Sequence, residues 1–389
     1  MVSAKGSLLA SAAALYGELF MSSDTTRYTL FGADFSYYSG KIRSYLLHKR
    51  LPFIERRANA WIYLALLPRR VKAAVVPVVL TPQGEWLQDS SVIIDELEQR
   101  SPECPVVPVT PVQRFASYLF ELWGDEFLLP LAMHTRWNRA EHLPWYAKEA
   151  GQVLLPGWPA VMQRWMGGKI ASGMRAHVQT LGFGLDMAPV LTRFGEIQLD
   201  GLNAHFAQHK FLLGNRPCLG DYGLIGPLYA HIGRDPLSRR DLIDPRPHLK
   251  AWIARMFDPH SSLGGEFLAD DQIPSTLLPA LRSIFDELLP FLQGCADAVR
   301  RLPQLPADTQ QAPRFLEPLS YPMAGATHQR AAASYPVWMA QRLLAVFAAM
   351  PAAEQQQVRA WLSSVGGEGV LQLDLPKVKR VGLAAAYIG

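Results

Sequence analysis

The stretch that most constrains the fold of this chain runs from Tyr28 to Gln99. It opens with an apolar run typical of a strand (Tyr28–Phe31), followed by a turn over residues 32–40 and a basic amphipathic helix from Lys41. A helix that opens in this turn directs its free backbone N–H groups and its positive dipole end at the hydroxyl groups of the turn. Such a place favours a bound anion or thiolate.

The rest of this stretch continues to alternate between strands and helices. The pattern predicts a second strand, a strand headed by proline at residues 75–80, a short turn, a fourth strand and a helix that ends near Gln99. This order is typical of a thioredoxin-like α/β domain. We therefore predict an α+β chain that begins with such a domain.

The remainder of the chain is predominantly helical. Three prolines between Ser101 and Pro108 predict a linker. From Pro111 to about Leu292, apolar residues recur at helical spacing, beginning with Phe115, Leu119, Leu122, Trp123, Phe127 and Leu128. A stretch bearing Pro and Gln, residues 302–318, then separates a C-terminal module.

That module is predicted to hold two amphipathic helices, a short strand and a basic tail. Val337 and Phe347 lie on the first helix, Val358 and Leu362 on the second, and the strand covers Val370–Leu373. The predicted division is a helical arm over 1–26, the thioredoxin-like domain over 27–101, a linker over 102–110, an all-helical domain over 111–294 and an extension over 295–389.

Composition and charge limit the classes of function. A chain with 49% hydrophobic content can bury an ample core, and its length of 389 residues suggests two or three domains. The net charge of +4, from 38 basic and 34 acidic residues, gives no strong basic face, so we expect no nucleic-acid partner. Cys104, Cys218 and Cys295 lack metal-ligand or disulfide spacing, so we expect no metal site and a reducing compartment.

The N-terminal arm superficially resembles a secretory signal. Its apolar run (Leu8–Tyr16) follows a single positive residue, Lys5, and continues through Glu18 and Phe20 as an amphipathic helix. The run is too short to span a bilayer, and no later segment is long enough. We expect a cytoplasmic protein whose arm packs on its own subunit or on a partner.

Three motifs follow one another in the first domain: Ser36–Arg43 (SYYSGKIR), Val75–Leu80 (VVPVVL) and Trp86–Ile94 (WLQDSSVII). Taken together, they resemble the glutathione S-transferase superfamily, in which a thioredoxin-like domain precedes an all-helical domain. The resemblance covers roughly residues 27–292. The arm and the last hundred residues or so lie outside the common pattern.

The first motif resembles the catalytic turn of that superfamily. The resemblance gives Ser36 the position of the hydroxyl that donates a hydrogen bond to the glutathione sulfur and so lowers the pKa of the thiol. Tyr37, Tyr38 and Ser39 are the alternative donors. The alternative for Ser36 is that it only caps the helix, as serine commonly does.

The second and third motifs resemble the glutathione-binding elements. In the superfamily the proline is preceded by a cis peptide bond, which would turn the backbone of Val76, before Pro77, toward the cysteinyl backbone of glutathione. Asp89 would bind the ammonium of the γ-glutamyl group, and Ser90 with the helix N-terminus would bind its carboxylate. The alternative is a plain helix cap without a ligand.

The electrophile pocket of such proteins borders the first long helix of the second domain. Trp123, His134, Arg136 and Trp137 lie there and could form aromatic walls, an acid and an anion-binding group. Core packing explains the tryptophans as well or better, and a surface ion pair with Glu126 or Glu141 explains Arg136.

Two functions remain open. The resemblance implies a homodimeric enzyme that binds glutathione as co-substrate and uses its thiolate on a small hydrophobic electrophile, by conjugation or thioether-forming cleavage. The alternative is a non-catalytic glutathione-transferase-like binding or assembly protein. Ser36, Asp89 and Ser90 favour the enzyme, whereas the additions at both ends favour the alternative.

Overall fold

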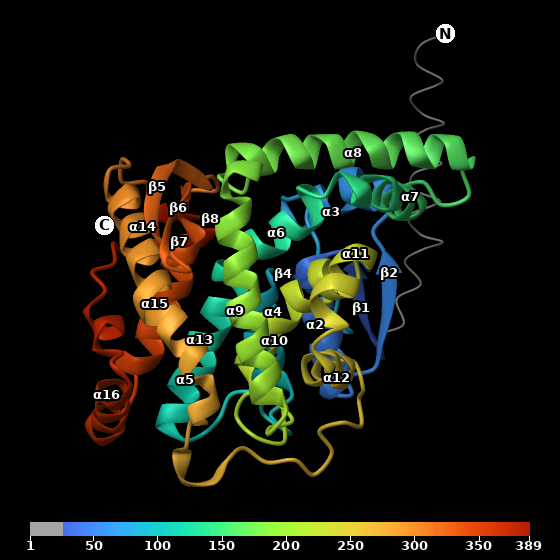
Figure 1. The fold of residues 1–389 in the computed structure, drawn as a ribbon. Helices are drawn as coiled ribbons and strands as arrows, with labels where there is room; N and C mark the ends of the chain where they lie inside the picture. Colours follow the sequence, from blue (N-terminus) through green and yellow to red (C-terminus); the bar gives the residue numbers. More distant parts are fainter. Residues whose placement is uncertain (1–25) are drawn as a thin grey trace.

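The computed structural model describes residues 26–389, so the predicted arm lies outside the described part except for its last residue. The first domain contains a four-stranded sheet, ordered β2-β1-β3-β4 (Figure 1). β1 (Tyr28–Gly32) pairs with β2 (Phe53–Arg57) in parallel, whereas β3 (Val78–Leu80) is antiparallel to both β1 and β4 (Trp86–Gln88). The predicted thioredoxin-like domain is confirmed.

Helices cover both faces of this sheet because its central strands are apolar on both sides. Leu30 and Val79 contact the core that includes α2 (Tyr37–His48) and α4 (Ser90–Arg100). Their neighbours Phe31 and Val78 point the other way, onto η1 (Ile62–Leu66) and α3 (Leu67–Val71). The sheet is therefore buried on both faces, as parallel pairing requires.

The predicted helical region follows an irregular linker that ends before α5. α5 and η2 carry the predicted apolar stripe, and all of its members are buried. The elements are α5 (Pro111–Leu122), η2 (Trp123–Phe127), α6 (Leu129–Trp137), η3 (Ala140–His142), α7 (Leu143–Leu154), α8 (Ala160–Thr180), η4 (Leu185–Met187), α9 (Ala188–Phe206), α10 (Leu219–Pro227), η5 (Leu228–Gly233), α11 (Pro236–Ser238), η6 (Arg239–Ile243), α12 (Pro247–Arg255), η7 (Ala269–Asp271), η8 (Ser275–Leu277), α13 (Leu278–Ser283), η9 (Ile284–Leu288) and α14 (Leu289–Arg300).

The C-terminal module departs in part from the prediction. The two predicted helices are present, as α15 (Tyr335–Ala348) and α16 (Ala352–Val365). The predicted strand at residues 370–373 is wrong, because residues 368–372 form the 3₁₀ helix η10 (Glu368–Gln372). Two β-hairpins were not predicted: β5 (Phe315–Met323) with β6 (Ala326–Ala333), and β7 (Val378–Val381) with β8 (Ala384–Tyr387).

This module shares one hydrophobic core with the rest of the chain. Phe347 of α15 and Trp361 of α16 pack edge-on against Phe115 of α5, with ring centroids 6.0 and 6.4 Å apart. Val337 and Leu343 of α15 are fully buried in the same core. The helical domain and the extension are therefore joined by packing, and the predicted boundary between them remains a prediction.

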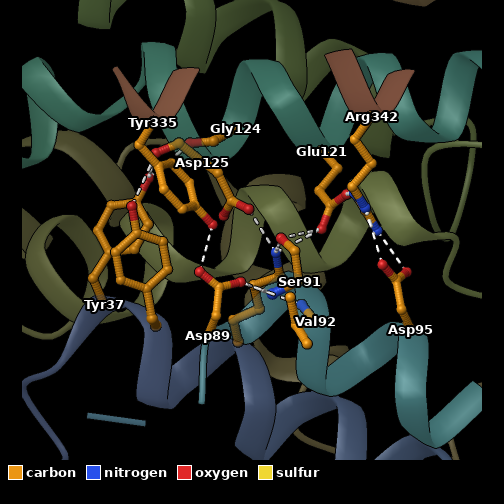
Figure 2. A network of polar contacts seen from close by, with 12 residues as sticks. Tyr37, Asp89, Ser91, Val92, Asp95, Glu121, Gly124, Asp125, Tyr335 and Arg342 are labelled. Carbon is orange, nitrogen blue, oxygen red and sulfur yellow. Dashed lines mark hydrogen bonds and ion pairs between the residues drawn. The ribbon is translucent and has the colours of Figure 1, made fainter. Parts of the chain in front are cut away.

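A buried network of charges joins the first domain, the helical region and the extension (Figure 2). Lys41 of α2 places its Nζ 2.8 Å from Glu121 Oε1 and 2.5 Å from Asp125 Oδ2. Arg342 of α15 pairs with the other oxygen of Glu121 and makes a two-bond contact, at 2.6 and 3.0 Å, with Asp95 of α4. Charge-assisted, two-bond contacts of this kind are directional as well as strong.

The two central carboxyl groups of this network titrate in opposite directions. Burial alone would raise the pKa of Glu121, but the charges of Arg342 and Lys41 outweigh it and hold this pKa below its usual value. Burial raises the pKa of Asp125, with Glu121 adding to the effect and Lys41 opposing it. Glu121 therefore stays ionised at neutral pH and is the negative partner of both Lys41 and Arg342.

We predict that Arg342→Met lowers the free energy of unfolding by about 3–5 kcal/mol at neutral pH, because it leaves Asp95 without its cation and Glu121 with Lys41 alone. Arg301→Met is the control, because its pair with Glu317 is exposed and contributes about 1 kcal/mol or less. Urea unfolding followed by circular dichroism measures both. Equal losses in the two variants would contradict the role given to the network.

The sign of the pH effect follows from the lowered pKa of Glu121. The stability that this group contributes is present above its unfolded-state pKa of about 4.3 and is lost as the pH falls through its lower folded-state value. The difference between wild type and Arg342→Met should therefore shrink as the pH falls below about 4.

Candidate functional site

A small cavity of about 70 Å³ lies where the three parts of the chain meet. Its walls come from the residues before β3, the start of α4, the end of η2, the β5–β6 hairpin and the start of α15. The lining residues are Tyr38, Val76, Pro77, Gln88, Asp89, Ser90, Glu126, Leu129, Arg314, Phe315, Arg330, Ala333, Tyr335, Pro336 and Leu383.

The four residues predicted to bind glutathione all lie on this cavity. The Val76–Pro77 peptide bond is cis, and both residues line the wall next to β3. Ser90 is the first residue of α4, and its hydroxyl has no hydrogen-bond partner in residues 26–389. The structure thus brings Val76, Pro77, Asp89 and Ser90 together, while their part in binding stays a prediction.

Asp89 has structural partners on both of its carboxylate oxygens (Figure 2). Oδ1 accepts hydrogen bonds from the backbone N–H groups of Ser91 and Val92 at 3.1 and 3.2 Å, which is an N-cap of α4. Oδ2 accepts one from the Tyr335 hydroxyl at 2.6 Å and lies 3.8 Å from Arg380 Nη1. The alternative interpretation of Asp89 as a helix cap therefore holds, and the extension uses its second oxygen.

The predicted catalytic residues lie beside the cavity rather than on it. Ser36 caps α2, since its Oγ accepts a hydrogen bond from the Ser39 N–H at 3.4 Å. The buried Tyr37 hydroxyl donates to the Gly124 carbonyl at 2.7 Å, and burial raises its pKa well above the usual value. Neither side chain lines the cavity, whereas Tyr38 does. The Tyr37 hydroxyl is thus hydrogen-bonded to the backbone of the helical region.

The two tryptophans predicted for the electrophile pocket lie in the core. Trp123 is fully buried, and its Nε1 donates to the Ser283 hydroxyl at 3.3 Å. Trp137 is 2% exposed and packs edge-on against Tyr146 at 4.7 Å. Their positions fit the packing explanation, and neither reaches the cavity.

The two polar candidates for that pocket also have structural partners. Arg136 makes a two-bond contact with Asp235, at 2.6 and 2.7 Å, and is 2% exposed. It does not pair with Glu126 or Glu141, because its guanidinium turns inward. Burial lowers the pKa of His134 to about 4, and its ring contacts Asn138 at 2.9 Å. The structure does not bring these four residues together with the cavity.

Three charged residues of the cavity were not predicted as site residues: Glu126, Arg314 and Arg330. The carboxylate of Glu126, at the end of η2, has no hydrogen-bond partner in the described part of the chain. Burial raises its pKa to about 7, although Arg330 and Arg314 act in the opposite direction. Arg330 of β6 is 2% exposed and reaches the same cavity. No spacing in the sequence links β6 to η2, so only the fold reveals this pair.

The described residues also form a second hollow, away from this cavity. A broader groove of about 890 Å³ lies between residues 208–209, α16 and residues 268–276, but it is open, and its Asp271 carboxylate caps α5 through the N–H groups of Val112 and Gln113. Within residues 26–389, no group of three or more His, Cys, Asp or Glu could hold a metal ion. None of the helices in this range is long and apolar enough to cross a membrane.

We predict that Glu126→Gln changes how stability depends on pH. The folded-state pKa of about 7 lies above the unfolded-state value, so the contribution of Glu126 is full at acidic pH and is lost as the pH rises through 7. From about pH 5 to pH 8, the unfolding free energy of wild type should fall by about 2–3 kcal/mol relative to the variant.

Urea unfolding at both pH values measures this difference. The charged groups that act on Glu126 are the same in both proteins, so the effect of their own titration on stability largely cancels in the comparison. They are Asp89, Lys41, Arg314 and Arg330. An unchanged pH dependence in the variant would show that Glu126 is ionised throughout.

Comparison with known proteins identifies the first domain. Residues 30–105 match the family described as glutathione S-transferase, N-terminal domain. No curated protein sequence matches the chain.

Similar solved structures were also found. A glutathione S-transferase from Rhodospirillum rubrum F11 has 19% identity and a TM-score of 0.39, with 64% of this chain and 96% of that chain covered. One from Methylobacterium radiotolerans JCM 2831, in complex with glutathione sulfonate, has 21% identity and a TM-score of 0.37, with 64% and 99% covered. The β-etherase LigF from Sphingobium sp. strain SYK-6 has 16% identity and a TM-score of 0.42, with 61% and 97% covered.

These identities and TM-scores are too low to carry an argument about function. The family match, by contrast, spans the sheet, α2, α4 and the cavity wall formed by Val76, Pro77, Asp89 and Ser90. Residues 30–105 of this chain are therefore similar to the N-terminal domain of glutathione S-transferases.

Proposed function

We propose that this chain is a glutathione-dependent transferase whose cavity at the start of α4 receives the γ-glutamyl end of glutathione. The observation that carries the proposal is that Val76, Pro77 and Ser90, which lie in the region that matches the glutathione S-transferase N-terminal domain, line one cavity. The free hydroxyl of Ser90 and the N-terminus of α4 supply hydrogen-bond donors and a positive dipole end for a carboxylate.

Ser36 is the proposed activator of the thiol. Its Oγ acts as an acceptor in the helix cap, so its O–H remains available as a donor. A hydrogen bond from this hydroxyl to the glutathione sulfur favours the thiolate, which then attacks a hydrophobic electrophile. Tyr38 is the second candidate because its ring lines the cavity. The proposed assembly is a homodimer.

The small size of the cavity supports a second candidate function, a non-catalytic role in binding or assembly. Sites for small-molecule ligands usually enclose about 300–1,000 Å³, whereas this cavity encloses about 70 Å³. It therefore has room for one end of glutathione, while the remainder needs space that the extension now covers. The contact of Tyr335 with Asp89 favours a non-catalytic role in binding or assembly, in which the extension stays closed.

Calorimetric titration of glutathione into wild type, Ser90→Ala and Ser36→Ala tests the proposal. Ser90→Ala should weaken binding by about tenfold or more, because a hydrogen bond to a carboxylate is lost. Ser36→Ala should leave the affinity nearly unchanged and raise the pKa of the bound thiol, read from thiolate absorbance, toward about 8.5. Ser90 serves better than Asp89, whose substitution also removes the cap of α4.

Ser320→Ala is the matched control, since Ser320 is an exposed residue of β5 outside the cavity. It should bind glutathione as wild type does. If wild type does not bind glutathione even at millimolar concentration, the transferase proposal fails and the assembly role is favoured.

A further inference from the structure

The cavity is lined by one carboxylate, that of Glu126, and two guanidinium groups, those of Arg314 and Arg330, that form no ion pair within residues 26–389. Arg314 is exposed, whereas Glu126 and Arg330 are buried. Both oxygens of Asp89 are used by α4 and Tyr335, as described above. The carboxylate of Glu126 accepts no hydrogen bond from any described residue. Arg330 forms no ion pair within residues 26–389, and its Nε has no hydrogen-bond partner. A negative and a positive group thus remain available on opposite parts of the chain, η2 and β6.

The guanidinium of Arg330 is held in place without a counter-ion. It lies over the ring of Phe291 at 4.2 Å and over that of Phe183 at 5.1 Å, and its Nη1 donates to the main-chain oxygen of Glu126 at 3.3 Å. Aromatic faces stabilise a cation but do not use its N–H donors. A guanidinium that is 2% exposed and lacks an anion is costly unless an anionic partner completes it.

We infer that Glu126 and Arg330 are binding residues for a zwitterionic α-amino-acid head group, Glu126 for its ammonium and Arg330, with Ser90, for its carboxylate. The choice of glutathione as the molecule that carries this head group rests on the proposed function. A cavity of about 70 Å³ is roughly the space of a few water molecules, which suits a head group and not a whole tripeptide.

This assignment differs from the one that the sequence predicts. The resemblance gives the ammonium to Asp89, whereas the structure already joins Asp89 to Tyr335 and to the start of α4. Glu126 offers the same chemistry from the helical region. The extension contributes the opposite charge, so the head-group site is complete only with the C-terminal module in place.

Paired changes in ligand and protein test the inference, with the full chain in calorimetric titrations. The ligands are glutathione, glutaryl-cysteinyl-glycine, which lacks the ammonium, and 4-aminobutyryl-cysteinyl-glycine, which lacks the α-carboxylate. Free L-glutamate is the fourth probe. The variants are Glu126→Gln and Arg330→Gln, with Glu317→Gln and Arg301→Gln as matched controls at an exposed ion pair.

Each variant should weaken glutathione binding by about tenfold or more, and each control should bind as wild type does. Arg330→Gln should have no further effect on the ligand without the carboxylate, and Glu126→Gln none on the ligand without the ammonium. This pairing is the signature of direct contact, because a general loss of folding would weaken all ligands alike.

The outcomes separate the inference from the proposed function. If wild type binds glutathione and both shortened analogues equally well, the inference is overturned and the proposed function stands, whatever the variants do. If glutathione does not bind but L-glutamate binds in a way that requires Arg330, the proposed function fails and the inference holds. If none of the four ligands binds wild type, both are overturned.

Discussion

The arrangement of this chain depends on one buried carboxylate, that of Glu121. Lys41 comes to it from the first domain and Arg342 from the extension, so three separate parts of the sequence meet on one negative charge. Removing any member leaves an uncompensated charge inside the protein. Hydrogen bonds between ions constrain the direction of the contact as well as its distance. The network therefore fixes how α15 lies across α4 and α5.

The position of α15 in turn decides what kind of site the chain can hold. The residues that begin this helix close the cavity over the start of α4, and the strand before it brings in Arg330. The N-terminal domain supplies backbone and hydroxyl groups, and the later parts of the chain supply most of the unpaired charge. A region similar to the N-terminal domain of glutathione S-transferases is here combined with cavity walls from the helical region and the extension.

The sequence was most informative where short-range pattern decides structure. Alternation of strands and helices, a proline at the head of an apolar run and an Asp-Ser pair at a helix start were enough to predict the first domain and to locate Val76, Pro77, Asp89 and Ser90. The same local signals failed in the extension. Pro318 and Pro322 lie within β5, and β8 consists largely of alanine. Neither sequence therefore has the composition typical of a strand.

The contacts that define the cavity could not be predicted because they join distant positions. Glu126 and Arg330 are 204 residues apart, Asp89 and Tyr335 are 246 residues apart, and no spacing rule connects either pair. Burial also changed several interpretations: Arg136 and Tyr37 look available in the sequence, yet both are used inside the fold. Sequence motifs locate the residues of a site, and tertiary contacts determine which of its polar groups are already bonded within the protein.

The hydrogen bond between Tyr335 and Asp89 has a thermodynamic consequence. One carboxylate holds the first turn of α4 with one oxygen and the first residue of α15 with the other. Occupation of the cavity and attachment of the extension are therefore linked equilibria with a shared coupling free energy. A ligand that competes with Tyr335 for that oxygen loosens the extension, and by reciprocity a firmly attached extension weakens that ligand. A ligand that contacts both α4 and the extension without displacing Tyr335 strengthens the attachment of the extension.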